Sequence, residues 1–145
     1  MIRTLTSLFF VLIFTGCNTS TTEEDIDNLN GYWEIKRVEK EAENPREYSF
    51  NQMVDYIEIE GQQGLRRKVR PQLDGSYIAS EDTELFTVII EGDSINMYYQ
   101  TPFSSWKETL ISSSEDEIEI LNQYGIKYTY QRFTPYLNDF DHEEE

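Results

Sequence analysis

The sequence predicts an all-β protein whose strands form an antiparallel up-and-down meander, closed into a barrel of about eight strands. Two observations support this prediction. β-Branched and aromatic residues occur in short runs that alternate with polar residues, which is the period of a half-buried strand. Ten tyrosines and eight phenylalanines accompany only seven glycines and four prolines, so the chain has enough large side chains to form a core.

Nine segments have this strand pattern, and turn signals separate them. In chain order they are 32–40, 53–60, 65–70, 75–80, 84–91, 94–100, 104–112, 116–122 and 125–133. The turns include GQQG at 61–64, Asp74-Gly75, EGDS at 91–94, SEDE at 114–117 and NQYG at 122–125. Such short connections favour antiparallel pairing, because parallel strands need crossovers of about a dozen residues. The one long connection, 41–52, contains Pro45 and has room for a turn of helix or a lid.

Each predicted strand has one apolar and one polar face. In 53–60, Ile57 and Ile59 alternate with Glu58 and Glu60. The apolar faces of three later strands carry Ile95, Met97 and Tyr99, then Ile118 and Ile120, and then Ile126, Tyr128 and Tyr130. A meander with one wet face closes into a barrel, which leaves no unpaired edge, or folds into two stacked sheets. We favour the barrel.

The stretch Asn30-Gly31-Tyr32-Trp33 resembles the start of the first strand in the lipocalin superfamily, which opens with Gly-any-Trp. The resemblance extends through the strand rhythm from Leu29 to about Phe133, and it is closest to small lipocalin-like lipoproteins of Bacteroidetes-type bacteria. It implies that Trp33 plugs one end of the barrel and that an arginine of the last strand, here Arg132, lies over its ring. Gly31, Trp33 and Arg132 are therefore expected to close the barrel.

This expected contact also tests the strand count. The first and last strands of a meander barrel pair antiparallel only when the number of strands is even, and contact between Trp33 and Arg132 requires that pairing. Nine strands do not permit it. Either one candidate, most simply 75–80, lies outside the barrel count, or the expected contact is wrong.

Residues 1–16 resemble the signal peptide of a bacterial lipoprotein. Arg3 precedes an apolar run at 8–14, which is far shorter than the roughly 20 residues that span a bilayer. Phe14-Thr15-Gly16-Cys17 resembles a lipobox, with Phe14 where Leu is usual, and the resemblance implies acyl chains such as palmitate on Cys17. The alternative is an ordinary signal peptide with an incidental cysteine. A lone cysteine cannot form an internal disulfide, which favours lipidation.

The polar and acidic segment 17–28 predicts a flexible tether ahead of a folded domain at 29–134, and 135–145 is predicted to be an acidic disordered tail. A membrane, reached through the lipid anchor, is the expected partner. The expected location is the cell envelope, with the outer membrane favoured. The formal net charge of −16 makes nucleic acid and anionic lipid headgroups poor partners.

The sequence offers few groups for catalysis. Its one histidine, His142, lies in the predicted tail, so Ser-His-Asp and Cys-His sites lack a base and His/Cys zinc sites lack ligands. No catalytic residue, metal or cofactor is expected. Glu108 is the one acid of interest, because Trp106 and Leu110 share its parity. Either Glu108 faces inward, or its strand is bulged or two-sided and the carboxylate is solvated.

Two sets of side chains are candidates for binding. Large rings and an adaptable methionine suit a ligand pocket, although the same side chains can fill a small barrel; this set is Met97, Tyr99, Trp106, Tyr128 and Tyr130. Arg66, Lys68 and Arg70 share one face of the segment 65–70. Cross-strand ion pairs with Glu58 and Glu60 explain these cations, and contact with an anionic ligand or partner is the alternative.

The expected function is the binding of a small apolar or amphipathic molecule by a lipid-anchored barrel. The alternative is a non-enzymatic structural or interaction lipoprotein, with a filled barrel that contacts another envelope protein. Connected interior space of about 300 Å³ or more favours the first hypothesis, and a filled interior favours the second. An enzyme would need two inward acids about 5 to 10 Å apart.

Overall fold

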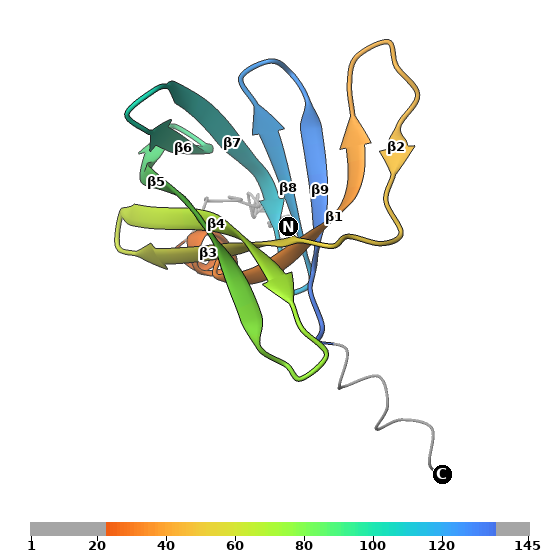
Figure 1. The fold of residues 1–145 in the computed structure, drawn as a ribbon. Helices are drawn as coiled ribbons and strands as arrows, with labels where there is room; N and C mark the ends of the chain where they lie inside the picture. The colour runs from red at the N-terminus through yellow and green to blue at the C-terminus, as the bar shows by residue number, and fades with distance from the viewer. Residues whose placement is uncertain (1–22, 136–145) are drawn as a thin grey trace, which may run out of the picture.

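The computed structural model describes residues 23–135, and its strands form one closed antiparallel barrel (Figure 1). In chain order the elements are α1 (Glu23–Asp27), β1 (Gly31–Glu39), β2 (Arg46–Glu47), β3 (Val54–Glu60), β4 (Gln63–Pro71), β5 (Tyr77–Glu91), β6 (Ser94–Gln100), β7 (Ser105–Ser113), β8 (Glu117–Asn122) and β9 (Lys127–Arg132). The sheet has the order β2-β1-β3-β4-β5-β6-β7-β8-β9, and β1 also pairs with β9. Eight strands, β1 and β3 to β9, therefore close the barrel. The predicted fold class is confirmed.

Strand β1 leaves β3 partway along its length. Residues 31–33 of β1 pair with β3, whereas residues 37–38 pair with the short strand β2. On its other edge β1 pairs with β9 from Trp33 to Glu39. The barrel is therefore closed tightly where β1 begins and is splayed open where β1 ends.

Strand β5 explains the difference between nine predicted strands and eight. Tyr77–Glu91 is one strand of 15 residues where the sequence predicted two, 75–80 and 84–91. Val69 pairs with Ala79 and Arg67 pairs with Thr83, so Lys68 alone lies opposite residues 80–82 and the strand bulges there. The bulge interrupts the alternation, which is why the two halves were predicted as separate strands. With an even number of strands, Trp33 lies opposite Arg132.

Two segments predicted to be irregular contain regular structure. The connection 41–52 holds β2 in place of a helical turn, and Asn51 Nδ2 near its end donates to the carbonyl of Ile35 at 2.8 Å. The predicted tether 17–28 ends in α1, whose Ile26 packs against the core, and Leu29 is fully buried. Regular structure in the described residues therefore begins at Glu23, within the segment predicted as a tether.

Other predicted segments lie outside the described residues. These are the signal peptide 1–16, Cys17 and residues 136–145 of the predicted tail. Within residues 23–135, none of the helical structure has the length and apolar character of a membrane span.

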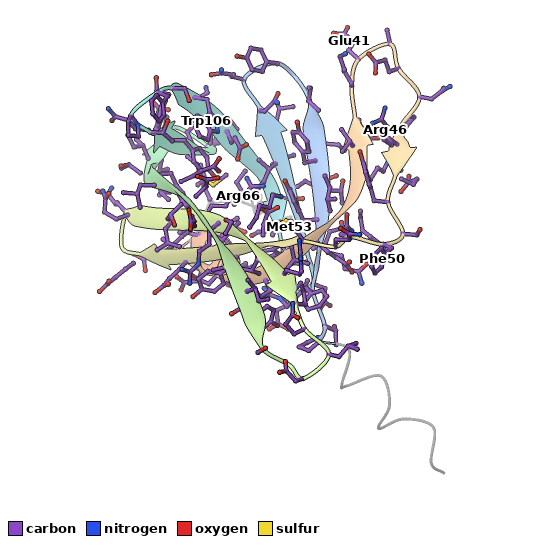
Figure 2. All side chains as sticks on the ribbon, in the orientation of Figure 1. Glu41, Arg46, Phe50, Met53, Arg66 and Trp106 are labelled. Atoms are coloured by element: carbon purple, nitrogen blue, oxygen red, sulfur yellow. The ribbon has the colours of Figure 1, made fainter. Side chains whose placement is uncertain are left out.

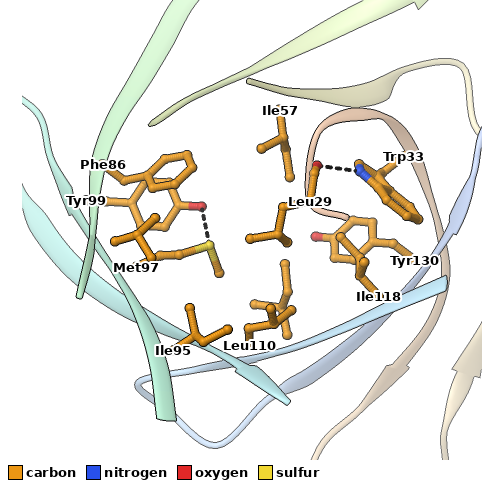
Figure 3. Packing of buried hydrophobic residues seen from close by; sticks show 12 residues of the cluster. Leu29, Trp33, Ile57, Phe86, Ile95, Met97, Tyr99, Leu110, Ile118 and Tyr130 are labelled. Carbon is orange, nitrogen blue, oxygen red and sulfur yellow. Dashed lines mark hydrogen bonds between the residues drawn. The ribbon is translucent and has the colours of Figure 1, made fainter. Parts of the chain in front are cut away.

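The closed half of the barrel is filled with side chains (Figure 3). The predicted inward positions Ile57, Met97 and Ile118 are each at most 1% exposed, which confirms the alternation. Burying a side chain of this size contributes about 1.5 to 3 kcal/mol. The rest of the cluster is formed by Leu29, Trp33, Phe86, Val88, Ile95, Tyr99, Leu110, Ile120 and Tyr130.

A second, smaller cluster is formed by side chains that point to the opposite face of the sheet from those of the main core. It consists of Val54, Val69 and Phe133 with Tyr32, Tyr56 and Tyr77 against them. The rings of Tyr32 in β1 and Tyr77 in β5 stack with centroids 4.2 Å apart. This contact holds the hairpin β4–β5 against the wall of the barrel where it extends past β3.

Candidate functional site

The closed end of the barrel is sealed by Trp33. Its side chain is 0% exposed, and its Nε1 donates to the carbonyl of Leu29 at 2.8 Å (Figure 3). The guanidinium carbon of Arg132 lies 4.2 Å from the centroid of the Trp33 ring system. Arg132 also donates to the carbonyls of Asn30 at 2.9 Å, Asn28 at 3.1 Å and Glu115. The arginine thereby ties the last strand to the segment that enters the first.

Gly31 makes room for this arginine. Its φ of +120° lies in the region that favours glycine, and a Cβ at this position would lie 2.6 Å from Arg132 Nη1. Gly31, Trp33 and Arg132, expected from the sequence to close the barrel, thus meet at one end. The indole nitrogen of Trp33 and the guanidinium of Arg132 both donate to backbone carbonyls, so neither needs a ligand as a hydrogen-bond partner.

The opposite end contains an open cavity of about 610 Å³. Its lining includes aromatic and apolar side chains, namely Ile35, Met53, Trp106, Tyr128 and Tyr130. It also includes charged side chains, among them Asp55, Arg66, Lys68, Asp82, Glu84 and Glu108. In Figure 2, Arg66 lies within the ring of strands and Trp106 lies on β7 across from it. Side chains leave this space open, which favours the ligand-binding hypothesis over the filled barrel.

Arg66 forms the floor of the cavity. Its side chain is 10% exposed, and its two terminal nitrogens donate to Glu108 Oε2 at 3.2 Å and to Asp55 Oδ2 at 3.1 Å. Nη2 also donates to the hydroxyl of Tyr130 at 2.7 Å. Lys68 Nζ approaches the same Asp55 oxygen at 2.8 Å. Each charge in this network has an opposite charge within reach, which burial demands.

The network changes the proton affinities of its members. Burial favours the neutral form of Asp55, but Arg66 and Lys68 outweigh it and hold the pKa of Asp55 below its ordinary value. Burial raises the pKa of Tyr130 to about 12 against the opposing effect of Arg66. Burial also raises the pKa of Glu84, with Arg66 opposing and the carboxylates of Glu108 and Asp55 adding to the rise. The pKa of Glu84 is therefore raised and that of Asp55 is lowered, although both carboxylates line the same cavity.

Glu108 faces the interior, the first of the two alternatives left by the sequence. Its side chain is 12% exposed and it pairs across strands with Met97. Trp106 and Leu110 share its parity: Trp106 is half-buried, and Leu110 is 7% exposed. The second alternative, a solvated Glu108, is wrong because Arg66 compensates the buried charge.

The predicted aromatic set divides between two layers. Trp106, Tyr128 and Tyr130 line the cavity, whereas Met97 and Tyr99 are 0% and 1% exposed in the packed core beneath it. The rings of Tyr99 and Trp106 stack in parallel with centroids 4.9 Å apart. Met97 and Tyr99 thus support the wall that Trp106 forms.

The predicted basic set also divides. Arg66 is buried, Lys68 has a 53% exposed side chain at the mouth, and Arg70 is exposed on the hairpin that extends past β3. The predicted ion pairs with Glu58 and Glu60 do not form, because these acids alternate with the inward positions and point to the other face. The partners are Asp55 and Glu108 instead. The predicted anion contact stays a prediction, with Arg66 and Lys68 already bound to carboxylates.

Three acids of the cavity were not predicted. Asp55 shares the parity of Ile57 and Ile59, and Glu84 shares the parity of Phe86 and Val88. An acid in register with an apolar face was therefore the signal available for both. Asp82 lies in the β5 bulge, where alternation gives no information about direction.

Comparison with known protein families agrees with the barrel. The lipocalin-like domain family matches residues 29–120 of this chain. A solved lipocalin-like protein from Bacteroides uniformis is similar at 11% identity and a TM-score of 0.46, covering 73% of this chain and 99% of that one. Apocrustacyanin C1 is similar at 8% identity and a TM-score of 0.46, covering 82% and 69%. No curated protein matches the chain.

Proposed function

The chain belongs to the lipocalin-like domain family, and from that premise we propose that it is a non-catalytic protein that holds a small amphipathic molecule in the open end of its barrel. The observation that carries the proposal is the cavity of about 610 Å³. Ligand pockets typically measure about 300 to 1,000 Å³. A lining that combines aromatic rings with charged groups suits a molecule with an apolar body and a polar head better than a purely apolar one.

The buried charges support a binding role. Buried ion pairs are seldom more stabilising than well-packed apolar residues of the same size, so a barrel that only needed to be stable would gain little from Arg66, Asp55 and Glu108. Placed at the floor of an open cavity, the same groups give a ligand polar atoms to recognise. Their presence is explained by recognition more simply than by stability.

Binding is also favoured over catalysis. Hydrolysis by paired carboxylates needs one of them protonated as a general acid. Asp55 and Glu108 instead both accept hydrogen bonds from one guanidinium, at 3.1 Å and 3.2 Å. Such a shared cation stabilises two ionised carboxylates, which is the arrangement of a fixed binding surface.

We further propose that Cys17 carries the lipid anchor and that the cavity opens away from the membrane. Asp25 and Asn28, in and just after α1, contact Ser113 at one end of β7, and Trp106 lines the cavity near the other end. Seven residues of strand separate Trp106 from Ser113, about 23 Å at 3.3 Å per residue. Residues 18–22 span at most about 20 Å, so an anchor at Cys17 holds the closed end next to the bilayer.

The anchor is tested by changing Cys17→Ala in the cells that make the protein. We expect the protein to leave the membrane fraction for the soluble envelope fraction. Retention of the unlipidated variant in the membrane would contradict the anchor and leave the binding proposal standing.

The binding proposal is tested by native mass spectrometry of the whole protein purified from its own envelope. We expect an additional mass from a small molecule, lost in Trp106→Ala, which removes part of the cavity wall. Phe103→Ala is the matched control, because Phe103 is 97% exposed on the neighbouring loop. The proposal would be refuted if the wild-type protein carried no additional mass and if no small amphiphile raised its thermal unfolding temperature.

A further inference from the structure

We infer that the molecule held in the cavity has a cationic head group, an organic ammonium, which the acidic side chains of the cavity receive. The inference rests on the proposed function and names the chemistry of the ligand's polar end. It departs from the anionic ligand considered for Arg66, Lys68 and Arg70.

The first argument is the charge balance of the cavity. Asp55 and Glu108 are matched by Arg66 and Lys68 through the contacts of 2.8 to 3.2 Å already described. The remaining acids are Glu84 and Asp82, and within residues 23–135 neither forms a salt bridge. The third cation along the lining, Arg67, directs its guanidinium carbon to 5.3 Å from the ring of Tyr56, in the outer cluster. Negative charge is therefore left over inside the mouth.

The position of Glu84 supports this balance. It pairs across strands with Arg66, yet Arg66 is already bound to two other carboxylates. Burial raises the pKa of Glu84, Arg66 and Lys68 oppose the rise, and the carboxylates of Glu108 and Asp55 add to it. A cation placed beside Glu84 would relieve the repulsion among these acids.

The second argument is an acceptor without a donor. Asp55 is 2% exposed, and its Oδ2 receives both Arg66 and Lys68, while Oδ1 has no hydrogen-bond partner among the described residues. A buried acceptor left unpaired costs about 1 to 3 kcal/mol. Because Oδ1 is itself buried, an ammonium in the cavity would offset this cost through its charge and not through direct contact.

The third argument is the aromatic wall. One face of Trp106 is covered by Tyr99, and Trp106 lines the cavity together with Tyr128 and Tyr130. Aromatic faces attract cations, and alkylated ammonium groups most characteristically bind among rings and carboxylates. The described residues contain no group of three or more His, Cys, Asp or Glu side chains that could hold a metal ion, so an organic cation fits better. An anion bound to Arg66 would have to displace Asp55 or Glu108, and it would face Glu84.

The test compares three probes with the same chain and different heads: octylammonium, octanol and octanoate. They are titrated calorimetrically, below micelle concentrations and at neutral pH, into the lipidated protein in nanodiscs of zwitterionic lipid, with empty nanodiscs as the blank. We expect octylammonium to bind at least about tenfold more tightly than octanoate, with octanol between them. Octanoate binding as tightly as octylammonium would overturn the inference while leaving amphiphile binding intact. Failure of all three probes to bind would refute the proposed function and the inference together.

Matched variants locate the effect. Glu84→Gln should reduce the preference for octylammonium over octanoate about three- to tenfold, and Asp82→Asn should act in the same direction. Glu60→Gln removes the same charge from an exposed position at the far end of β3 and should leave the preference unchanged. An equal loss in Glu84→Gln and Glu60→Gln would show that net charge alone sets the preference, and an unchanged preference in both cavity variants would show that these acids do not meet the ligand. Either result would overturn the inference.

Discussion

Each end of the barrel contains an arginine with different partners: Arg132 at the closed end is half-buried, and Arg66 at the open end is buried. At the closed end Arg132 donates to the backbone carbonyls of Asn28, Asn30 and Glu115 and covers the ring of Trp33. At the open end Arg66 is compensated by the side-chain carboxylates of Asp55 and Glu108.

Backbone carbonyls are neutral and fixed by the fold, so the closed end is complete without a ligand. Carboxylates are charged, and one oxygen of Asp55 remains without a partner. The arginine bound to backbone therefore closes the barrel, whereas the arginine bound to side-chain charges lies on a surface that can still bind a ligand.

The largest expected effect separates the two tryptophans. Trp33→Ala should lower the free energy of unfolding by about 3 to 5 kcal/mol, because it empties a fully buried site. Trp106→Ala, at the half-buried wall of the cavity, should cost about 1 to 2 kcal/mol. Urea denaturation of both variants measures the difference. Equal losses would remove the distinction between a structural end and a binding end.

The next prediction concerns the arginine of the open end. Arg66→Met should cost about 2 to 4 kcal/mol, because it leaves Asp55 and Glu108 buried without a counter-charge. Lys68→Met, whose side chain is 53% exposed, should cost less than about 1 kcal/mol. Adding Asp55→Leu and Glu108→Leu to Arg66→Met should restore stability but not ligand binding. If the triple variant is as unstable as Arg66→Met alone, the network serves the fold and not recognition.

A smaller effect is expected for the glycine of the closed end. Gly31→Ala should cost about 2 to 3 kcal/mol, because the added Cβ meets Arg132 Nη1 at 2.6 Å and the backbone has a φ of +120°. Gly61→Ala is the control: Gly61 also has a positive φ, +62°, but nothing lies within 4 Å of its Cβ, so about 1 to 2 kcal/mol of strain remains. Thermal unfolding of both variants isolates the contact with the arginine. Identical losses would show that backbone strain alone selects Gly31.

The smallest effect is a pH dependence of the open end. The charged groups around Glu84 are Arg66 and Lys68 on β4, Glu108 on β7 and Asp55 on β3. The pKa of Glu84 is raised in the folded protein. The folded state therefore binds the proton of the Glu84 carboxyl group more tightly than the unfolded state does. The resulting contribution to folding stability is fully present below the ordinary pKa of 4.5 and is lost as the pH rises through the folded-state pKa. In Glu84→Gln, the midpoint of urea denaturation should change less with pH across that window. Asp55 acts in the opposite sense and loses its contribution as the pH falls through its lowered pKa.

Several features could be predicted from local sequence because they depend on neighbours along the chain. Alternation placed Ile57, Met97 and Ile118 inside, and the turn residues set most strand ends. The β5 bulge could not be predicted, because Ser80-Glu81-Asp82 interrupts alternation as a true loop would. α1 was missed because one apolar residue, Ile26, anchors a segment whose composition is otherwise that of a tether.

By itself the sequence determined the meander and the strand faces, since period-two alternation and short turns constrain each strand and its neighbour. The meeting of Gly31, Trp33 and Arg132 was expected only from the resemblance to lipocalins. Only the tertiary structure decided that Arg66 joins Asp55 to Glu108 and that a charged cavity remains above the core. Arg66 and Glu108 lie 42 residues apart and come together only when the barrel closes. The polarity of the cavity therefore depends on closure of the barrel. Strands that are distant in the chain decide which acids stay hydrated and which acids gain a counter-ion.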